Sequence, residues 1–153
     1  MWFKYILAFF IFWLSIILQT SFLAHFSIFG GVVNLVFVLF FLFTFFENPG
    51  SYFGVINAIL AGFFLDVFSH TYFGLSIASL ALIYFMNKYG IYILDKKKDK
   101  FPAIYFVPLF LISFILHNLI LNLSSFNLSE IIYNLAVSLL LFYLYKKFAK
   151  PSQ

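Results

Sequence analysis

Apolar residues occur in long runs along this chain, and short polar stretches separate the runs. A helix needs about 20 apolar residues to cross roughly 30 Å of hydrocarbon. Turn signals such as Glu47-Asn48-Pro49-Gly50 and the charged run 95–100 lie between the runs. We therefore expect an all-α polytopic membrane protein whose single transmembrane domain, 1–153, is a six-helix bundle. The expected helices are 2–18, 32–46, 52–68, 75–94, 103–123 and 131–145.

Composition narrows the class further. Hydrophobic residues make up 65% of the chain and charged residues 9%, a balance typical of membrane proteins and not of water-soluble domains. The absence of Cys excludes disulfides, thiol nucleophiles and Cys-based metal sites. The sequence has no HExxH, GxSxG or P-loop motif, and His25, His70 and His117 lack the spacing of metal ligands. We therefore expect no enzymatic activity, cofactor or metal.

The lysines set the orientation that we expect, because basic loops stay on the cytoplasmic side of a membrane. With Lys4 inside, four crossings return the chain inside at 95–100, and two more bring Lys146 inside. Both termini are therefore predicted to be cytoplasmic. A re-entrant pair formed by the second and third segments would keep this parity and stays open. The topology accounts for the basic clusters without a nucleic-acid partner. The segments expected to face outward are 19–31, 69–74 and 124–129.

Small residues recur at four-residue steps in the third segment and form one face of a helix: Gly54, Ala58, Gly62 and Asp66. Small side chains let another backbone approach closely, so this face is expected either to pack inside the bundle or to receive a partner helix. Burying the Asp66 carboxylate in hydrocarbon would cost at least about 2.5 kcal/mol. Three explanations for Asp66 stay open: a hydrated helix end, hydrogen bonding with the following loop, and a proton or cation relay.

Polar side chains form stripes on the fifth and sixth helices. The stripes consist of Ser113, His117, Asn118 and Asn122 on one helix, and of Glu130, Asn134 and Ser138 on the other. Because unpaired polar groups in lipid are costly, we expect the stripes to face each other and to pair His117 or Asn118 with Asn134. A ligand-binding cavity, with His117 as its pH-sensitive member, is the alternative.

Several short stretches together resemble a known family. They are Leu18-Gln19-Thr20-Ser21-Phe22-Leu23, then Ile28-Phe29-Gly30 and Asn34-Leu35, and finally Gly62-Phe63-Phe64-Leu65-Asp66-Val67-Phe68-Ser69 followed by Gly74-Leu75. The last stretch is similar to the pattern Gly-Phe-x-x-Gly/x-Asp-x-x-Ser and the later Gly-Leu of the rod-shape-determining protein MreD family. The resemblance runs essentially from end to end and includes length and helix count. It departs at Val33, where the family commonly has Pro.

The resemblance implies a non-enzymatic component of the cell-elongation machinery in the bacterial inner membrane. Such a protein associates with MreC, a single-span membrane protein, and through it with MreB-like actin and the peptidoglycan synthases, and so helps to maintain cell shape. Partner contacts would then involve the small-residue face and Gly74.

The runner-up is a substrate-binding S-component of an energy-coupling-factor vitamin transporter, which the MreD family resembles in fold. That function would require a ligand cavity near the outer face, and the polar stripes are placed to line one. Against it, the first helix lacks the Ala-x-x-x-Ala pattern of those subunits, because Phe12 lies four residues after Ala8. A channel would require several pore-lining polar helices, which the sequence does not contain.

Overall fold

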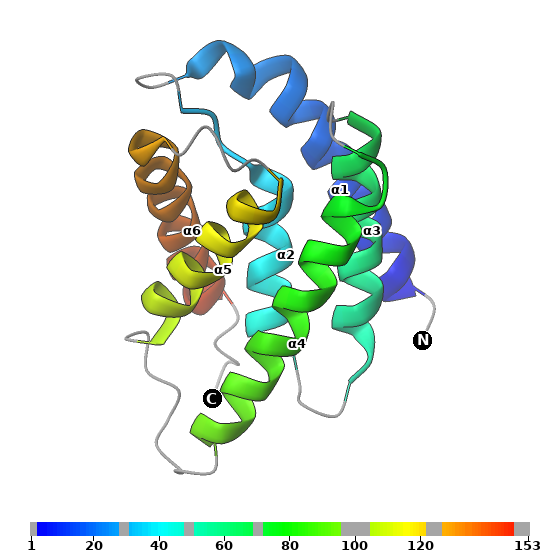
Figure 1. Ribbon diagram of the computed structural model, residues 1–153, viewed down its shortest axis with the longest axis vertical. Helices are drawn as coiled ribbons and strands as arrows, with labels where there is room; N and C mark the ends of the chain where they lie inside the picture. Colours follow the sequence, from blue (N-terminus) through cyan, green and yellow to red (C-terminus); the bar gives the residue numbers. More distant parts are fainter. Residues whose placement is uncertain are drawn as a thin grey trace.

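The computed structural model describes residues 3–27, 31–47, 51–68, 72–95, 105–121 and 127–148. Every element in these ranges is helical, and the elements pack as a bundle (Figure 1). The prediction of an all-α bundle is therefore confirmed. The α-helices are α1 (Phe3–Ile17), α2 (Leu35–Phe45), α3 (Phe53–Phe68), α4 (Leu75–Asp95), α5 (Phe106–Leu121) and α6 (Leu128–Phe148).

The first helix continues into a region that was expected to be a loop. A π-helical turn, η1 (Leu18–Phe22), and a 3-10 turn, η2 (Leu23–Phe26), follow α1 directly. The polar residues here do not end the helix because their side chains find backbone partners: the Thr20 hydroxyl donates to the Ile16 carbonyl over 2.9 Å. The expectation that the first helical stretch ends at residue 18 is therefore wrong, because helical turns continue to Phe26.

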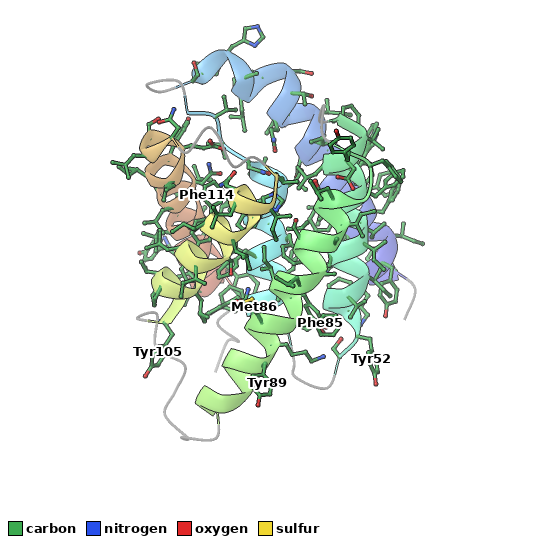
Figure 2. The ribbon with its side chains drawn as sticks, viewed as in Figure 1. Tyr52, Phe85, Met86, Tyr89, Tyr105 and Phe114 are labelled. Atoms are coloured by element: carbon green, nitrogen blue, oxygen red, sulfur yellow. The ribbon has the colours of Figure 1, made fainter. Side chains whose placement is uncertain are left out.

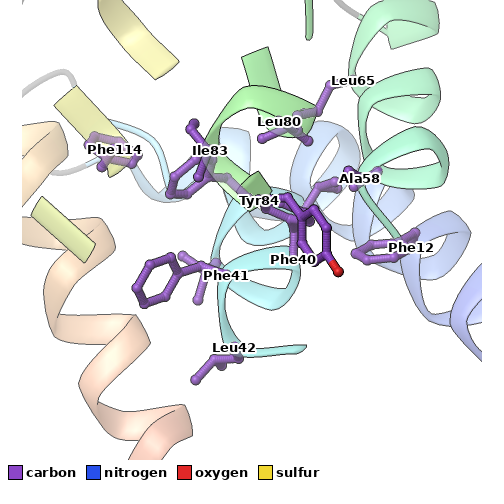
Figure 3. Close-up of a cluster of buried hydrophobic side chains, with 14 of the residues drawn as sticks. Phe12, Phe40, Phe41, Leu42, Ala58, Leu65, Leu80, Ile83, Tyr84 and Phe114 are labelled. Carbon is purple, nitrogen blue, oxygen red and sulfur yellow. The ribbon is translucent and has the colours of Figure 1, made fainter. Parts of the chain in front are cut away.

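The central helix of the bundle is α2, which contacts each of the other five α-helices. Apolar residues occupy almost all of its length, and Val36, Phe37 and Phe40 are completely buried. A helix that is apolar on all sides is stable only when neighbours surround it. Figure 3 shows Phe40 and Phe41 of α2 among buried side chains from α1, α3, α4 and α5.

Phenylalanine rings join α2 to α5. Phe106, Phe110 and Phe114 follow one another at four-residue steps on α5, and successive rings are nearly parallel, with interplanar angles of 17° and 11°. Two rings of α2 pack against this row in T-shaped pairs. The Phe37 and Phe114 centroids are 5.2 Å apart, and the Phe41 and Phe110 centroids are 5.1 Å apart. Edge-to-face pairs of this kind add about 0.5–1.5 kcal/mol each beyond the area they bury.

Consecutive helices run in alternating directions along the bundle (Figure 1). The starts of α1, α3 and α5 therefore lie toward the same end as the last turns of α2, α4 and α6. Two helical stretches, Phe3–Phe26 and Leu128–Phe148, are long and apolar enough to cross a membrane, and α2, α3 and α5 are shorter apolar helices. This arrangement is compatible with antiparallel membrane crossings.

Candidate functional site

Asp66, near the end of α3, caps the start of α4. Its Oδ2 accepts the N–H of Gly74 over 2.8 Å, and its Oδ1 accepts the N–H of Ser76 over 2.9 Å. Backbone N–H groups at a helix start have no partner within the helix and carry partial positive charge. A carboxylate at this place satisfies them and is itself stabilised, although its side chain is only 4% exposed. Of the three explanations for Asp66, the geometry favours hydrogen bonding with the segment that follows α3.

Gly74 completes this cap through its backbone. Its φ is +95°, which lies in the left-handed region. Glycine adopts this conformation without strain, whereas any residue with a Cβ would be strained in it. That conformation accompanies the hydrogen bond from the Gly74 N–H to Asp66. Gly74 therefore serves the turn between α3 and α4, and an added Cβ would meet no atom within 4 Å.

Gly62 allows α3 and α4 to approach each other closely. A Cβ at this position would lie 2.5 Å from the Cα and 2.7 Å from the backbone nitrogen of Ile77 on α4. Contacts this short with backbone cannot be relieved by a change of rotamer, so any larger residue would push the two helices apart. Such close packing adds van der Waals contact between the two helices.

The rest of the small-residue face is also covered by the same chain. Ala58 is fully buried, and a Cβ on Gly54 would collide with the Tyr84 ring of α4 and the Glu47 carboxylate. Of the two interpretations of this face, the geometry therefore supports packing inside the bundle. Among the described residues, Ile77 and Tyr84 of α4 and the Glu47 carboxylate cover this face.

A second polar cluster holds the start of α2. The Asn34 side chain accepts the Phe37 N–H over 3.0 Å and so caps the helix. The side chain of Gln19 accepts the Val36 N–H over 3.4 Å. From α6, Asn134 accepts the Asn34 N–H over 2.7 Å, and its amide donates to the Val32 carbonyl over 3.2 Å.

The polar stripes of α5 and α6 therefore do not pair with each other, and this expectation was wrong. Asn134 binds the segment before α2, whereas His117 faces α4, where its Nδ1 lies 2.8 Å from the Ser79 hydroxyl. Ser113 exchanges hydrogen bonds with the Asn87 amide of α4 over 3.1 and 3.2 Å. Because α5 packs against α2, α4 and α6, its polar side chains had three possible neighbours, and the sequence pattern could not distinguish them.

The remaining members of the predicted network make local bonds. The Asn118 amide donates to the Phe114 carbonyl of its own helix, and the Ser138 hydroxyl donates to the Leu135 carbonyl. Asn122 lies outside the described residues. These side chains satisfy themselves within one helix, so they do not join α5 to α6.

A few buried polar atoms have no hydrogen-bond partner among the described residues: both amide atoms of Asn57, the Ser76 hydroxyl and His117 Nε2. Asn57 and His117 are completely buried. Buried polar groups without a partner are costly, and these lie on α3, α4 and α5.

Lysine and tyrosine side chains gather at the opposite end of the bundle. Lys88 donates to the Ser51 carbonyl over 2.9 Å and to the Tyr84 hydroxyl over 2.7 Å. Glu47 caps α3, because its Oε1 accepts the Gly54 N–H over 2.8 Å. The start of α4 is thus capped by an acidic residue of α3, and the start of α3 by an acidic residue that follows the end of α2.

The sequence prediction omitted the polar residues of α4 that complete these contacts. Ser79 and Asn87 are eight residues apart, which places them on one face of a helix. That spacing was the signal available in the sequence. No group of three or more potential metal-ligating side chains occurs within the described part of the chain.

The polar side chains described above hold neighbouring helices in register and cap helix ends. Most of their hydrogen bonds go to backbone groups of the same chain. No protein-family model matches the chain, and the searches of curated proteins and of solved structures found no match.

Proposed function

We propose that this chain is a non-enzymatic, multi-pass component of the cell-elongation machinery in the bacterial inner membrane, where it associates with an MreC-like single-span protein. Through that partner it would act on MreB-like actin and the peptidoglycan synthases and so maintain cell shape. The proposal rests on the resemblance to the MreD family and on what the residues that carry the resemblance do in the fold.

One observation carries most weight. Gln19, Asn34 and Asp66 belong to three separate stretches of the resemblance, and each accepts a backbone N–H at the start of α2 or α4. Both helix starts lie toward the same end of the bundle (Figure 1). A coincidental likeness between apolar sequences would have no reason to select the side chains that cap helices. That the residues of the resemblance cap helices in this fold therefore supports the proposal.

The distribution of charge and aromatic rings supports the membrane orientation. Lys4, Lys88 and Lys146 lie on the first turn of α1 and on the later turns of α4 and α6, toward one end of the bundle. Tyr52 and Tyr89 lie at a similar level near that end (Figure 2), and they are 79% and 69% exposed. Lysines mark the cytoplasmic side and tyrosines the headgroup level, so we infer that this end faces the cytoplasm.

The S-component alternative has less support. The polar stripes that were expected to line its ligand cavity bind other parts of the chain: His117 binds Ser79, and Asn134 binds the segment before α2. A binding cavity between α5 and α6 would need these groups free to meet a ligand.

Co-purification tests the proposal. The tagged chain is expressed together with the MreC-like protein of the same organism, and the complex is captured from mild detergent, with an unrelated polytopic protein of similar size as the matched bait. We expect the MreC-like protein to be retained by the chain and not by the control bait. Monodisperse chain that retains no more than the control contradicts the proposal.

A further inference from the structure

An apolar groove runs between α2 and α6 at the end of the bundle that carries the lysines. Its volume is about 570 Å³, and its walls include Leu39 and Leu42 of α2 and Leu141 and Leu144 of α6. Leu144 is 39% exposed and Tyr145, also in the wall, is 49% exposed, so the groove opens on the surface of the bundle. A surface groove of this kind inside a bilayer fills with whatever apolar chain fits it best.

The length of the groove favours a lipid chain over a partner helix. Its walls extend from residue 39 to 46 on α2 and from 141 to 148 on α6, which at 1.5 Å per residue is about 10 Å. A spanning helix needs a complementary surface over most of the roughly 30 Å hydrocarbon core, whereas one lipid chain occupies a single leaflet, about half of that. The groove is therefore matched to the inner leaflet alone.

Lysines lie at the same end of the bundle as the groove. Lys4 Nζ lies 4.9 Å from the centroid of the Phe53 ring, and Phe53 is part of the wall. Lys146 and Lys147 are exposed in the last turn of α6, directly after Tyr145. The carboxylate in the wall, Glu47, is held by the N–H of Gly54 at the positive start of α3. The three lysines outnumber this one carboxylate, so this end of the bundle favours an anionic headgroup.

We propose that this groove binds one anionic phospholipid of the inner leaflet, with an acyl chain between α2 and α6 and the headgroup phosphate at the end of the bundle that carries Lys4, Lys146 and Lys147. Basic pockets between transmembrane helices on the cytoplasmic side bind anionic headgroups by this combination of apolar contact and charge. The inference rests on the membrane orientation given under the proposed function, but it does not depend on the MreC-like partner.

Native mass spectrometry of the full chain tests the site. The detergent-purified protein is titrated with phosphatidylglycerol and, separately, with phosphatidylcholine of the same acyl chains. We expect one phosphatidylglycerol to be retained in preference. The double variant K146Q/K147Q should bind it roughly 25-fold more weakly, a factor of about five for each lysine, with phosphatidylcholine unaffected. The variant K97Q/K98Q removes the same charge from another part of the sequence and should keep the preference.

A matched pair on α6 tests the groove itself. Leu141→Trp fills the groove, whereas Leu140→Trp adds the same bulk at a neighbouring side chain that is 60% exposed and not part of the wall. We expect loss of the retained lipid in the first variant only. Equal retention of both lipids by the native chain, or equal behaviour of the two Trp variants, would show ordinary surrounding lipid and overturn the site.

Two further outcomes separate this inference from the proposed function. If added MreC-like protein displaces the phosphatidylglycerol, the groove belongs to the partner, and the lipid site is overturned while the proposed function gains support. If the chain is extracted from membranes by alkaline carbonate, the membrane placement on which both proposals rest is wrong. A chain that resists extraction but shows no lipid preference overturns the lipid site alone.

Discussion

Replacing Asp66 by Ala should destabilise the bundle more than any nearby surface change. The carboxylate accepts the N–H groups of Gly74 and Ser76 at 2.8 and 2.9 Å and lies 3.4 Å from that of Ile77. A hydrogen bond to a charged group contributes about 1.5–3 kcal/mol, and loss of a helix cap costs up to about 2 kcal/mol. Because these contributions overlap, we expect a loss of about 3 kcal/mol in the free energy of unfolding.

Asp66→Asn separates shape from charge. The amide keeps the size of the side chain and one acceptor oxygen. Its NH₂ group takes the place of the other carboxylate oxygen, so one of the two backbone N–H groups, that of Gly74 or that of Ser76, would face a donor and lose its hydrogen bond. The expected loss is therefore about half that of the Ala variant, roughly 1.5 kcal/mol. Val67→Ala is the matched control, because Val67 is the next residue and is 51% exposed, and its expected effect is within about 0.5 kcal/mol.

Equilibrium unfolding of the three variants in the same detergent, followed by circular dichroism, measures these differences. Folded yield and elution profile are recorded first, so that a variant that misfolds is recognised. If Asp66→Ala unfolds at the same denaturant concentration as Val67→Ala, the cap does not stabilise the bundle, and the account of α3 and α4 as a fixed pair is refuted.

Three other predictions concern the packing of α3 on α4, the partner of Asn134 and the membrane topology. Gly62→Leu should sharply reduce folded yield, because its Cβ would lie 2.5 Å from the Ile77 Cα; yield equal to the native chain would contradict the close packing of α3 on α4. Asn134→Leu should cost about 1–2 kcal/mol in detergent unfolding and Asn118→Leu much less, since Asn134 bonds across to the segment before α2 and Asn118 only to its own helix; equal costs would disprove this. In intact cells, an impermeant thiol reagent should modify a Cys placed at Ser27 and not one at Lys98, and the reverse would invert the topology.

The positions of the helices were largely readable from the sequence. The apolar run 52–68 corresponds to α3, Phe53–Phe68, and the run 75–94 corresponds to α4, Leu75–Asp95. The sequence marked these ends clearly, because the turn signal Glu47-Asn48-Pro49-Gly50 precedes the first run and the charged residues 95–100 follow the second. The continuation of α1 to Phe26 was not readable. There the polar side chain of Thr20 bonds to the helix backbone and so removes the usual reason for the helix to end.

The pairing of polar groups was much harder to predict than their location. The stripe with His117 is present on α5, but which neighbour it meets depends on the rotation of each helix about its axis, and four-residue spacing does not specify that angle. His117 turns toward Ser79, and Asn134 turns toward a non-helical segment. For Asp66, hydrogen bonding with the following loop was one of three explanations that the sequence left open, and the Gly74 turn is close enough along the chain for the carboxylate to reach it.

The central claim is that this chain is a membrane component of the cell-elongation machinery, and cell shape after its depletion tests that claim most directly. The gene is placed under a repressible promoter in its own rod-shaped host, and the ratio of cell length to width is measured as the protein disappears, with re-expression of the native chain as the control. We predict that the cells widen and become round before growth stops, and that re-expression restores rods. Cells that remain rod-shaped through several divisions without detectable protein would contradict the claim.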